Sequence, residues 1–261
     1  RRHRLGDGHH DGVGSGREIE IGGTTSGPLD TAGTALGLID TETDRVLSGT
    51  LIIGGVDSGN VRVIRPVTTE PNVNLSLVSL NDIIQSDGGS ATTTGTITTD
   101  GTGAVQFTTI NGSYQPIPDN LGVAPVLVDV TAPGGVTFGA GTKLAITMNG
   151  DPVNTPPALG DSEAATGYRR LTVNGPINLA GAELIVGGTF IPIAPAAGPF
   201  PVVVATGVLT PAFTYPVVGN IGGSNYGAAI SYNVSGNNAV LAIVASPEIA
   251  AYSGVAPPAD E

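Results

Sequence analysis

The residue types best suited to metal chemistry lie near the start of the chain. Asp7, His9, His10 and Asp11 place four side chains of ligand type within five positions, and imidazole and carboxylate groups are common zinc ligands. The surrounding glycine-rich stretch has no hydrophobic periodicity, so no scaffold fixes the geometry that a metal site requires. We therefore predict a solvated segment here and no metal site.

Hydrolytic chemistry would need either a nucleophile with a histidine base or a pair of carboxylates. All three histidines lie in residues 1–17, so a Ser/His/Asp triad would require that segment to fold onto the rest of the chain. Carboxylates for glycoside cleavage are available, but each stands alone at a predicted corner: Asp40, Glu42, Asp44, Asp57 and Asp87. We predict no catalytic residue and no enzymatic activity.

Acidic, glycine-containing corners offer oxygen atoms of the kind that bind calcium. Asp57–Gly59, Asp87–Gly89 and Asp100–Gly103 are of this type, but calcium takes six or more oxygen ligands. These corners also lack the nonapeptide aspartate repeat of calcium-binding β-rolls. The pattern favours aspartate-stabilised turns, and no helix follows Gly101 and Gly103 as a phosphate loop would need. We predict no cofactor.

Composition excludes several classes of partner. The 261 residues include 22 acidic and 10 basic side chains, a formal net charge of −12, so no basic surface is available to neutralise nucleic-acid phosphates or to bind an anionic membrane. Cysteine is absent, which excludes disulfides and thiolate metal sites. No apolar run approaches the ~20 residues of a transmembrane helix, and we predict no membrane insertion.

Short strands that alternate apolar and polar residues organise the chain. Gly49–Gly54 and Gly59–Ile64 are β-branched runs separated by a small turn, and a period of two is typical of strands with one buried face. The predicted inward residues are Leu51, Ile53, Val61, Val63, Leu75 and Leu77, and the outward ones Thr50, Ile52, Arg62, Asn74 and Ser76. Further strands are predicted at 83–84, 95–98, 103–108, 126–130, 135–138, 143–148, 171–173, 177–179, 183–186, 190–193, 200–204, 228–234 and 238–244.

Two all-β architectures compete for this spacing. A sandwich or barrel uses hairpin-connected strands of five or six residues, whereas a parallel β-helix stacks short strands with a corner between them. Short strands, aliphatic inward residues and few Asn-Gly hairpins favour an all-β, right-handed parallel β-helix (solenoid) over residues 18–200. An antiparallel C-terminal cap is expected to contain Phe213, Tyr215, Tyr226 and Tyr232.

The expected organisation has five parts. Residues 1–17 form a flexible N-terminal arm or the end of a preceding coil, and residues 18–150 form the β-helix region. Residues 151–168 form a loop or seam, residues 169–245 a C-terminal strand-repeat block with its cap, and residues 246–261 a Pro/Ala-rich tail. Within the second part, residues 111–125 are expected to be a loop or a boundary between sub-blocks. A helix of under two turns is expected within 28–47, with Asp40 or Thr41 as N-cap and Asp44 in its first turn.

The progression Leu36–Asp40, Gly49–Gly54, Ser58–Val63, Asn74–Ser79 and Ile83 resembles the passenger repeats of filamentous-haemagglutinin-like and autotransporter-like bacterial surface proteins. Residues 171–186 and 198–203 look like the closing repeat of such proteins, so the resemblance covers about residues 30–90 and 168–245. It implies secretion, a β-helical shaft, and a role in adhesion or cell-surface structure.

These observations lead to one functional hypothesis and one alternative. The first is a non-catalytic extracellular structural or adhesive protein of a bacterial cell surface, a shaft or fibre subunit that self-associates through its strand ends and contacts surface glycans. The alternative is a carbohydrate-binding or carbohydrate-cleaving β-helix, with a groove lined by Asp57, Arg62 and Arg65.

Overall fold

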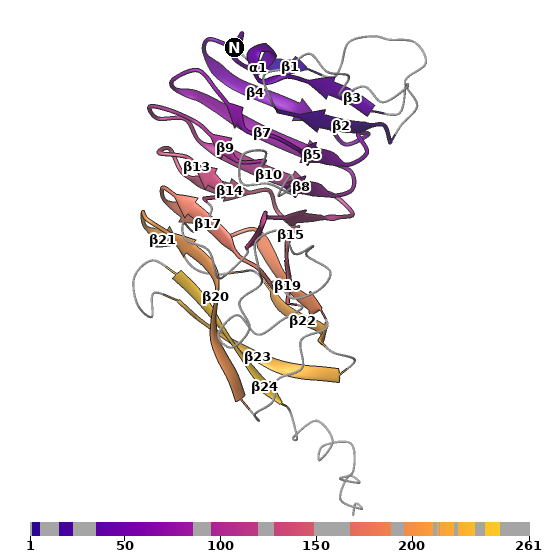
Figure 1. The fold of residues 1–261 in the computed structure, drawn as a ribbon, viewed down its shortest axis with the longest axis vertical. Helices are drawn as coiled ribbons and strands as arrows, with labels where there is room; N and C mark the ends of the chain where they lie inside the picture. Colours follow the sequence, from indigo (N-terminus) through magenta and orange to yellow (C-terminus); the bar gives the residue numbers. More distant parts are fainter. Residues whose placement is uncertain are drawn as a thin grey trace, which may run out of the picture.

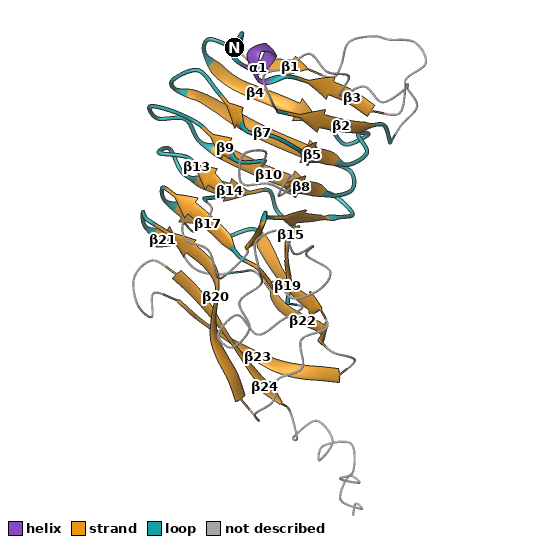
Figure 2. Cartoon of the chain, viewed as in Figure 1, coloured by secondary structure: helices purple, strands orange, loops and turns teal. Residues whose placement is uncertain are grey.

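The computed structural model describes residues 2–5, 16–22, 35–85, 95–119, 128–148, 168–188, 196–210, 213, 215–221, 224–232 and 238–245. Strands make up most of this part of the chain, and α1 (Asp40–Thr43) is the helix within it (Figure 2). The expectation of an all-β chain with parallel sheets is confirmed.

A seven-stranded sheet, the first sheet, contains parallel strands throughout. Each strand is in direct register with its neighbours, as in the pairing of Leu51 with Leu75 and of Leu75 with Val105. In spatial order its strands are β1 (Arg2–Leu5), β4 (Gly49–Gly54), β7 (Val73–Ser79), β10 (Val105–Thr109), β14 (Val136–Phe138), β18 (Ile177–Asn178) and β21 (Leu209–Thr210).

A second sheet of 15 strands has two parallel arms joined by an antiparallel pair. Arm one contains β3 (Ala35–Leu38), β2 (Glu18–Ile21), β5 (Val61–Val63), β8 (Ile83–Gln85), β11 (Ser113–Gln115), β15 (Thr142–Thr147), β19 (Ala182–Gly188) and β22 (Tyr215–Ile221). Arm two contains β6 (Val67–Thr68), β9 (Ile97–Thr98), β13 (Val130–Thr131), β17 (Leu171–Asn174) and β20 (Ala196–Ala205). A small two-stranded sheet pairs β12 (Pro118–Asp119) with β16 (Tyr168–Arg169) antiparallel.

Along the sequence, successive strands belong in a fixed order to the first sheet, to arm one and to arm two. It runs β4, β5, β6, then β7, β8, β9, then β10, β11, β13, and continues in this way to β20. We call each such set of three strands a round. Successive rounds lie one below the other along the long axis of the molecule (Figure 1). Residues far apart in the sequence therefore become neighbours in a sheet, as Leu51 and Leu75, Val61 and Ile83, or Val130 and Val173 do.

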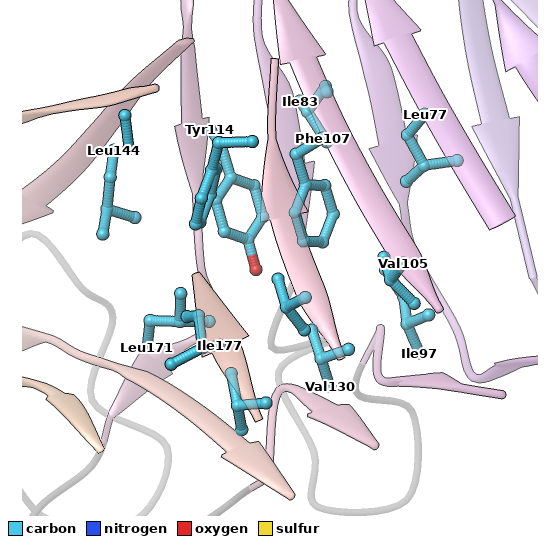
Figure 3. Close-up of a cluster of buried hydrophobic side chains, with 14 of the residues drawn as sticks. Leu77, Ile83, Ile97, Val105, Phe107, Tyr114, Val130, Leu144, Leu171 and Ile177 are labelled. Atoms are coloured by element: carbon cyan, nitrogen blue, oxygen red, sulfur yellow. The ribbon is translucent and has the colours of Figure 1, made fainter. Parts of the chain in front are cut away.

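Alternation within each strand places the aliphatic side chains in the interior between the sheets. Leu51, Ile53 and Leu77 are fully buried, as the sequence predicts, and burial of each such side chain contributes about 1.5–3 kcal/mol. One predicted outward residue differs: Ser76 is only 7% exposed because Ile52 and Gln106 flank it on the neighbouring strands. The interior is aliphatic along most of its length, with an aromatic group at its middle (Figure 3).

The N-terminal end was expected to be either a flexible arm or the end of a preceding coil. β1 pairs with β4, Arg2 opposite Thr50, so residues 2–5 fit the second of these alternatives. β3 pairs with the outer side of β2. The expected short helix is present as α1, but the predicted N-cap is wrong: Ile39 holds that position, and Asp44 is the C-cap. The Glu42 carboxylate replaces a capping side chain by accepting the Ile39 N–H at 3.1 Å.

Residues 111–125 were expected to form a loop or a boundary between sub-blocks, and the loop is wrong for their described part. β11 and β12 both lie there: Tyr114 and Ile117 are buried, and Tyr114 pairs with Ile83 and Leu144. Strand 190–193 and most of the seam at 151–168 lie outside the described residues.

The C-terminal strands pair antiparallel, as predicted. β23 (Ser224–Tyr232) pairs with β22 and β24 (Asn238–Ala245), and β24 pairs with β20. The two strands therefore join the ends of the two arms at the end of the molecule opposite to α1 (Figure 1). The Phe213 N–H donates to the Tyr232 hydroxyl at 3.1 Å, which ties the segment after β21 to this pair.

Candidate functional site: a buried polar cluster

Four polar side chains lie buried where arm one meets arm two. Gln85 ends β8, Tyr114 is central in β11, Asp129 immediately precedes β13, and Arg169 lies in β16. Their exposed fractions run from 0 to 5%. Buried polar groups are costly unless they are hydrogen-bonded, so this cluster is the first place to look for a functional arrangement.

Gln85 is the centre of the cluster. The Tyr114 hydroxyl donates to Gln85 Oε1, and Gln85 Nε2 donates to the carbonyls of Gly95 at 2.8 Å and Asp129 at 3.0 Å. Alternation from Ile83 points this side chain inward, where all its bonds are to groups of the protein. The amide thereby joins the corner of its own round to Asp129 in the next.

Asp129 binds the backbone on two sides of the corner. Its Oδ1 accepts the Ile117 N–H at 2.9 Å, and its Oδ2 accepts the Thr172 N–H at 2.6 Å. Bonds between a carboxylate and backbone N–H groups are stronger than neutral ones. The side chain therefore ties β17 of the following round to the segment between β11 and β12.

The Tyr114 ring connects the cluster to the interior. It stacks on Phe107, with centroids 4.0 Å apart and planes inclined by 13°, and Phe138 lies 6.2 Å from it (Figure 3). Burial, and then the negative charge of Asp129, raise the Tyr114 pKa well above its ordinary value, and Arg169 opposes this shift. The phenol is therefore neutral at physiological pH and acts as a hydrogen-bond donor.

Arg169, the fourth member of the cluster, and the adjacent Arg170 are buried cations, with exposed fractions of 5% and 8%. Arg169 Nη1 donates to the Pro116 carbonyl, next to the point where β12 pairs with β16. Gln85 ends the described segment before residues 86–94, and Asp129 and Arg169 come two positions after residues 127 and 167. The cluster thus lies where the long connections from arm one to arm two begin and end.

The cluster is suited to holding this corner together. Asp129 uses both carboxylate oxygens on backbone donors, Gln85 uses both ends of its amide, and Tyr114 is neutral. None of these three side chains is exposed. The arrangement stabilises the junction of three rounds, and we assign it that role.

A second group of charges lies at the N-terminal end. Asp40 Oδ1 accepts the Thr68 N–H at 2.6 Å, and the pKa of Asp44 is raised by partial burial, then by the negative charges of Asp40 and Glu70. Within the described residues no group of three or more His, Cys, Asp or Glu side chains is placed to hold a metal ion.

The carboxylates considered for glycoside cleavage do not form one site in the described part of the chain. Asp40, Glu42 and Asp44 are in or next to α1, beside β6, whereas Asp57 is exposed in the turn between β4 and β5. Asp87 lies outside the described residues, as do the four metal-type residues Asp7, His9, His10 and Asp11.

The two arginines of the proposed groove and one acidic corner can be followed in the described part of the chain. Arg62 lies on the outward face of β5 and Arg65 is exposed after it. Asp100 Oδ1 accepts the Gly101 N–H at 2.6 Å, and the Gly103 N–H donates to the Asp100 carbonyl at 3.0 Å. Asp100 therefore stabilises a turn, as the sequence favours.

Sequence reasoning missed all four members of the buried cluster. Alternation from Ile83 could have placed Gln85 inward, and Tyr114 was the one aromatic residue of its polar stretch. Asp129 and Arg169 gave no such signal, because their burial depends on partners 12 to 53 positions away.

No family model matches the chain, and neither the curated proteins nor the solved structures contain a match to it. In the described part of the chain, no helix has the length and apolar character needed to cross a membrane.

Proposed function

We propose that the rounds form a right-handed parallel β-helix. Support comes from the fixed order in which the chain visits the first sheet, arm one and arm two, and from the direct register of successive strands. Crossovers between parallel strands of one sheet are right-handed in nearly all known cases, which gives the hand. The antiparallel pair β23–β24 serves as the cap of the C-terminal end.

One observation carries the functional proposal: polar side chains at the corners bind the backbone of the adjacent round. Asn72 Oδ1 accepts the Thr102 N–H at 2.9 Å, and Asn74 Oδ1 accepts the Ala104 N–H at 2.9 Å. Asp82 Oδ1 accepts the Ser113 N–H at 2.7 Å. Side chains of the types that could act on a ligand are thereby used to hold rounds together.

From this use of polar groups we infer a mechanical role. The chain is a non-catalytic extracellular structural or adhesive protein of a bacterial cell surface, in which the β-helix is the shaft. The resemblance of residues 30–90 and 168–245 to passenger repeats of filamentous-haemagglutinin-like and autotransporter-like proteins favours this location. A net charge of −12 supplies solubility, and surface glycans are the expected external partners.

Self-association is the second part of the proposal. β1 and β21 are the two end strands of the first sheet; β1 lies at the α1 end of the molecule, and β21 lies further down, with β23 and β24 beyond it (Figure 1). An end strand presents unpaired backbone groups to another chain. Parallel addition of β1 of one copy to β21 of the next continues the first sheet and generates a head-to-tail fibre.

The proposal is tested by light scattering on the purified full chain over a wide concentration range, combined with incubation with neutral and acidic polysaccharides. We expect the mass to grow with concentration and the polysaccharides to remain uncleaved. Release of shortened glycans would overturn the non-catalytic role, and a constant monomer mass at every concentration would overturn self-association.

A further inference from the structure

β6 is the end strand of arm two on the N-terminal side. In a parallel ladder, alternate residues direct their backbone N–H and C=O groups to opposite neighbours. The N–H groups of Val67 and Thr69 donate to Thr96 and Thr98 of the adjoining β9 segment, at 2.9 and 3.1 Å. The backbone groups of Thr68 therefore face the other way, toward the open end of the arm.

Side chains of α1 bind both of these outward groups. Asp40 Oδ1 accepts the Thr68 N–H at 2.6 Å, and the Thr43 hydroxyl donates to the Thr68 carbonyl at 3.1 Å. The Asp40 carboxylate also accepts the Thr68 hydroxyl at 3.0 Å. One donor and one acceptor from α1 thus take the positions that a further strand would otherwise fill.

The helix is fixed for this contact from several directions. Thr43 is fully buried, and its hydroxyl also donates to the Asp40 carbonyl at 2.6 Å, so its one proton is shared between that carbonyl and the carbonyl of Thr68. Glu42 holds the start of the helix by accepting the Ile39 N–H. The N-terminal end strands are β3 in arm one, β1 in the first sheet and β6 in arm two. Among the described residues, β6 is the end strand whose outward backbone groups are bound by a helix.

We propose that α1 is an edge plug that prevents a strand of a second copy of this chain from pairing with β6. A second copy is the occupant because β6 continues the in-register parallel ladder of β9, β13 and β17, which is the same template that this chain uses for itself. The opposite end of arm two is covered by β24, which pairs antiparallel with β20.

The edge plug would act whether or not the native chain forms fibres, so this inference does not depend on the proposed function. If fibres form through β1 and β21, the plug keeps β6 of arm two out of the contact between copies. If the native chain stays monomeric, the plug still closes an edge that would otherwise be open to aggregation.

The test uses the double variant Asp40→Ala/Thr43→Val of the full chain, with Thr41→Ala as a control. Thr41 is exposed on the same helix, and its replacement leaves both contacts to Thr68 in place. Residue-resolved amide exchange by NMR reports the Thr68 N–H, with the Val67 N–H as an internal reference because it donates to Thr96. Analytical ultracentrifugation then compares the masses of the variants with that of the native chain.

We expect the Thr68 amide of the double variant to exchange about tenfold faster or more, because it loses a bond to a charged acceptor. The exchange rate of the Val67 amide should not change. The double variant should also have a larger mass than the native chain at equal concentration. Thr41→Ala should match the native chain in both measurements. Unchanged exchange at Thr68, or faster exchange without added mass, would overturn the proposal.

If the Val67 amide of the double variant also exchanges faster, the variant has unfolded locally. In that case the proposal is tested with single variants of Asp40. Asp40→Asn keeps a carbonyl oxygen as an acceptor for the Thr68 N–H, whereas Asp40→Ala keeps none. The plug predicts faster Thr68 exchange and greater mass for Asp40→Ala than for Asp40→Asn. Equal behaviour of the two variants would contradict it.

Discussion

Tyr114 and Phe107 stack face to face in the interior, with ring centroids 4.0 Å apart and planes inclined by 13° (Figure 3). Phe107 comes from the first sheet and Tyr114 from arm one, so the stack joins two walls of the molecule within a single round. The Tyr114 hydroxyl then donates to Gln85 of the preceding round. One side chain therefore belongs both to the apolar interior and to the buried polar cluster.

Replacing Tyr114 by Phe should destabilise the chain through the polar cluster alone. The ring stack is retained, but Gln85 Oε1 loses its donor in a site that water does not reach. An unsatisfied buried acceptor costs about 1–3 kcal/mol. Urea unfolding followed by circular dichroism measures this loss, and a variant as stable as the native chain would show that the hydroxyl contributes nothing.

Alkaline titration should leave Tyr114 protonated after ordinary tyrosines have ionised. Its folded-state pKa is raised, chiefly by burial, so the folded protein holds this proton more tightly than the unfolded chain does. The resulting stability is present in full below pH ~10, the ordinary tyrosine pKa, and is lost as the pH rises through the folded-state value.

Absorbance near 295 nm follows tyrosine ionisation during that titration. We expect at least one of the six tyrosines to ionise only when the chain unfolds, and Tyr114→Phe to remove that delayed step. Ionisation of all tyrosines before any loss of secondary structure would contradict the buried, neutral phenol.

Asp129 and Asp100 provide a matched pair of aspartates with opposite expectations. Asp129→Ala leaves the buried N–H group of Ile117 and the part-buried one of Thr172 without this acceptor, at a cost of about 2–4 kcal/mol. Asp100→Ala removes one exposed contact to Gly101, and should cost less than about 1 kcal/mol. Equal unfolding midpoints for the two variants would refute the assigned role of Asp129.

Alanine substitutions at Gly54 and Gly141 distinguish the cost of a steric clash from the cost of a strained backbone. Both have positive φ, +85° and +77°, but a Cβ at Gly54 would lie 2.0 Å from the Val78 carbonyl oxygen, whereas one at Gly141 meets nothing within 4 Å. Gly141→Ala should therefore cost only the ~1–2 kcal/mol of a left-handed alanine. Gly54→Ala also displaces a neighbouring strand and should cost about 2–5 kcal/mol. The unfolding midpoints of the two variants measure these costs. A larger loss of stability for Gly141→Ala than for Gly54→Ala would contradict the close approach of β4 and β7.

Much of the fold was predictable because the interior is built from alternating residues. Leu51, Ile53, Val61 and Val63 point inward as their period of two indicates, and alternation depends only on local sequence. The N-terminal end was not predictable in this way. The pairing of β3 with the outer side of β2 and the contact of Asp40 with Thr68 depend on tertiary placement that no local pattern encodes.

The buried polar cluster was the least predictable feature. Asp129 and Arg169 have residue types that are mostly exposed, and their burial is offset by partners 12 to 53 positions away, most of them in other rounds. A single sequence carries no record of those partners. The role of Asp100 in a turn was easier to predict. Its side chain accepts the N–H of the next residue, Gly101, and such a contact depends only on local sequence.

The central claim is that this chain is a shaft that adds copies end to end through the first sheet, from β21 of one copy to β1 of the next. Electron microscopy of the purified full chain tests it most directly, because shape and association are seen together. The account predicts unbranched filaments one molecule wide, with the long axis of each molecule along the filament. Compact, separate particles at every concentration examined would contradict it.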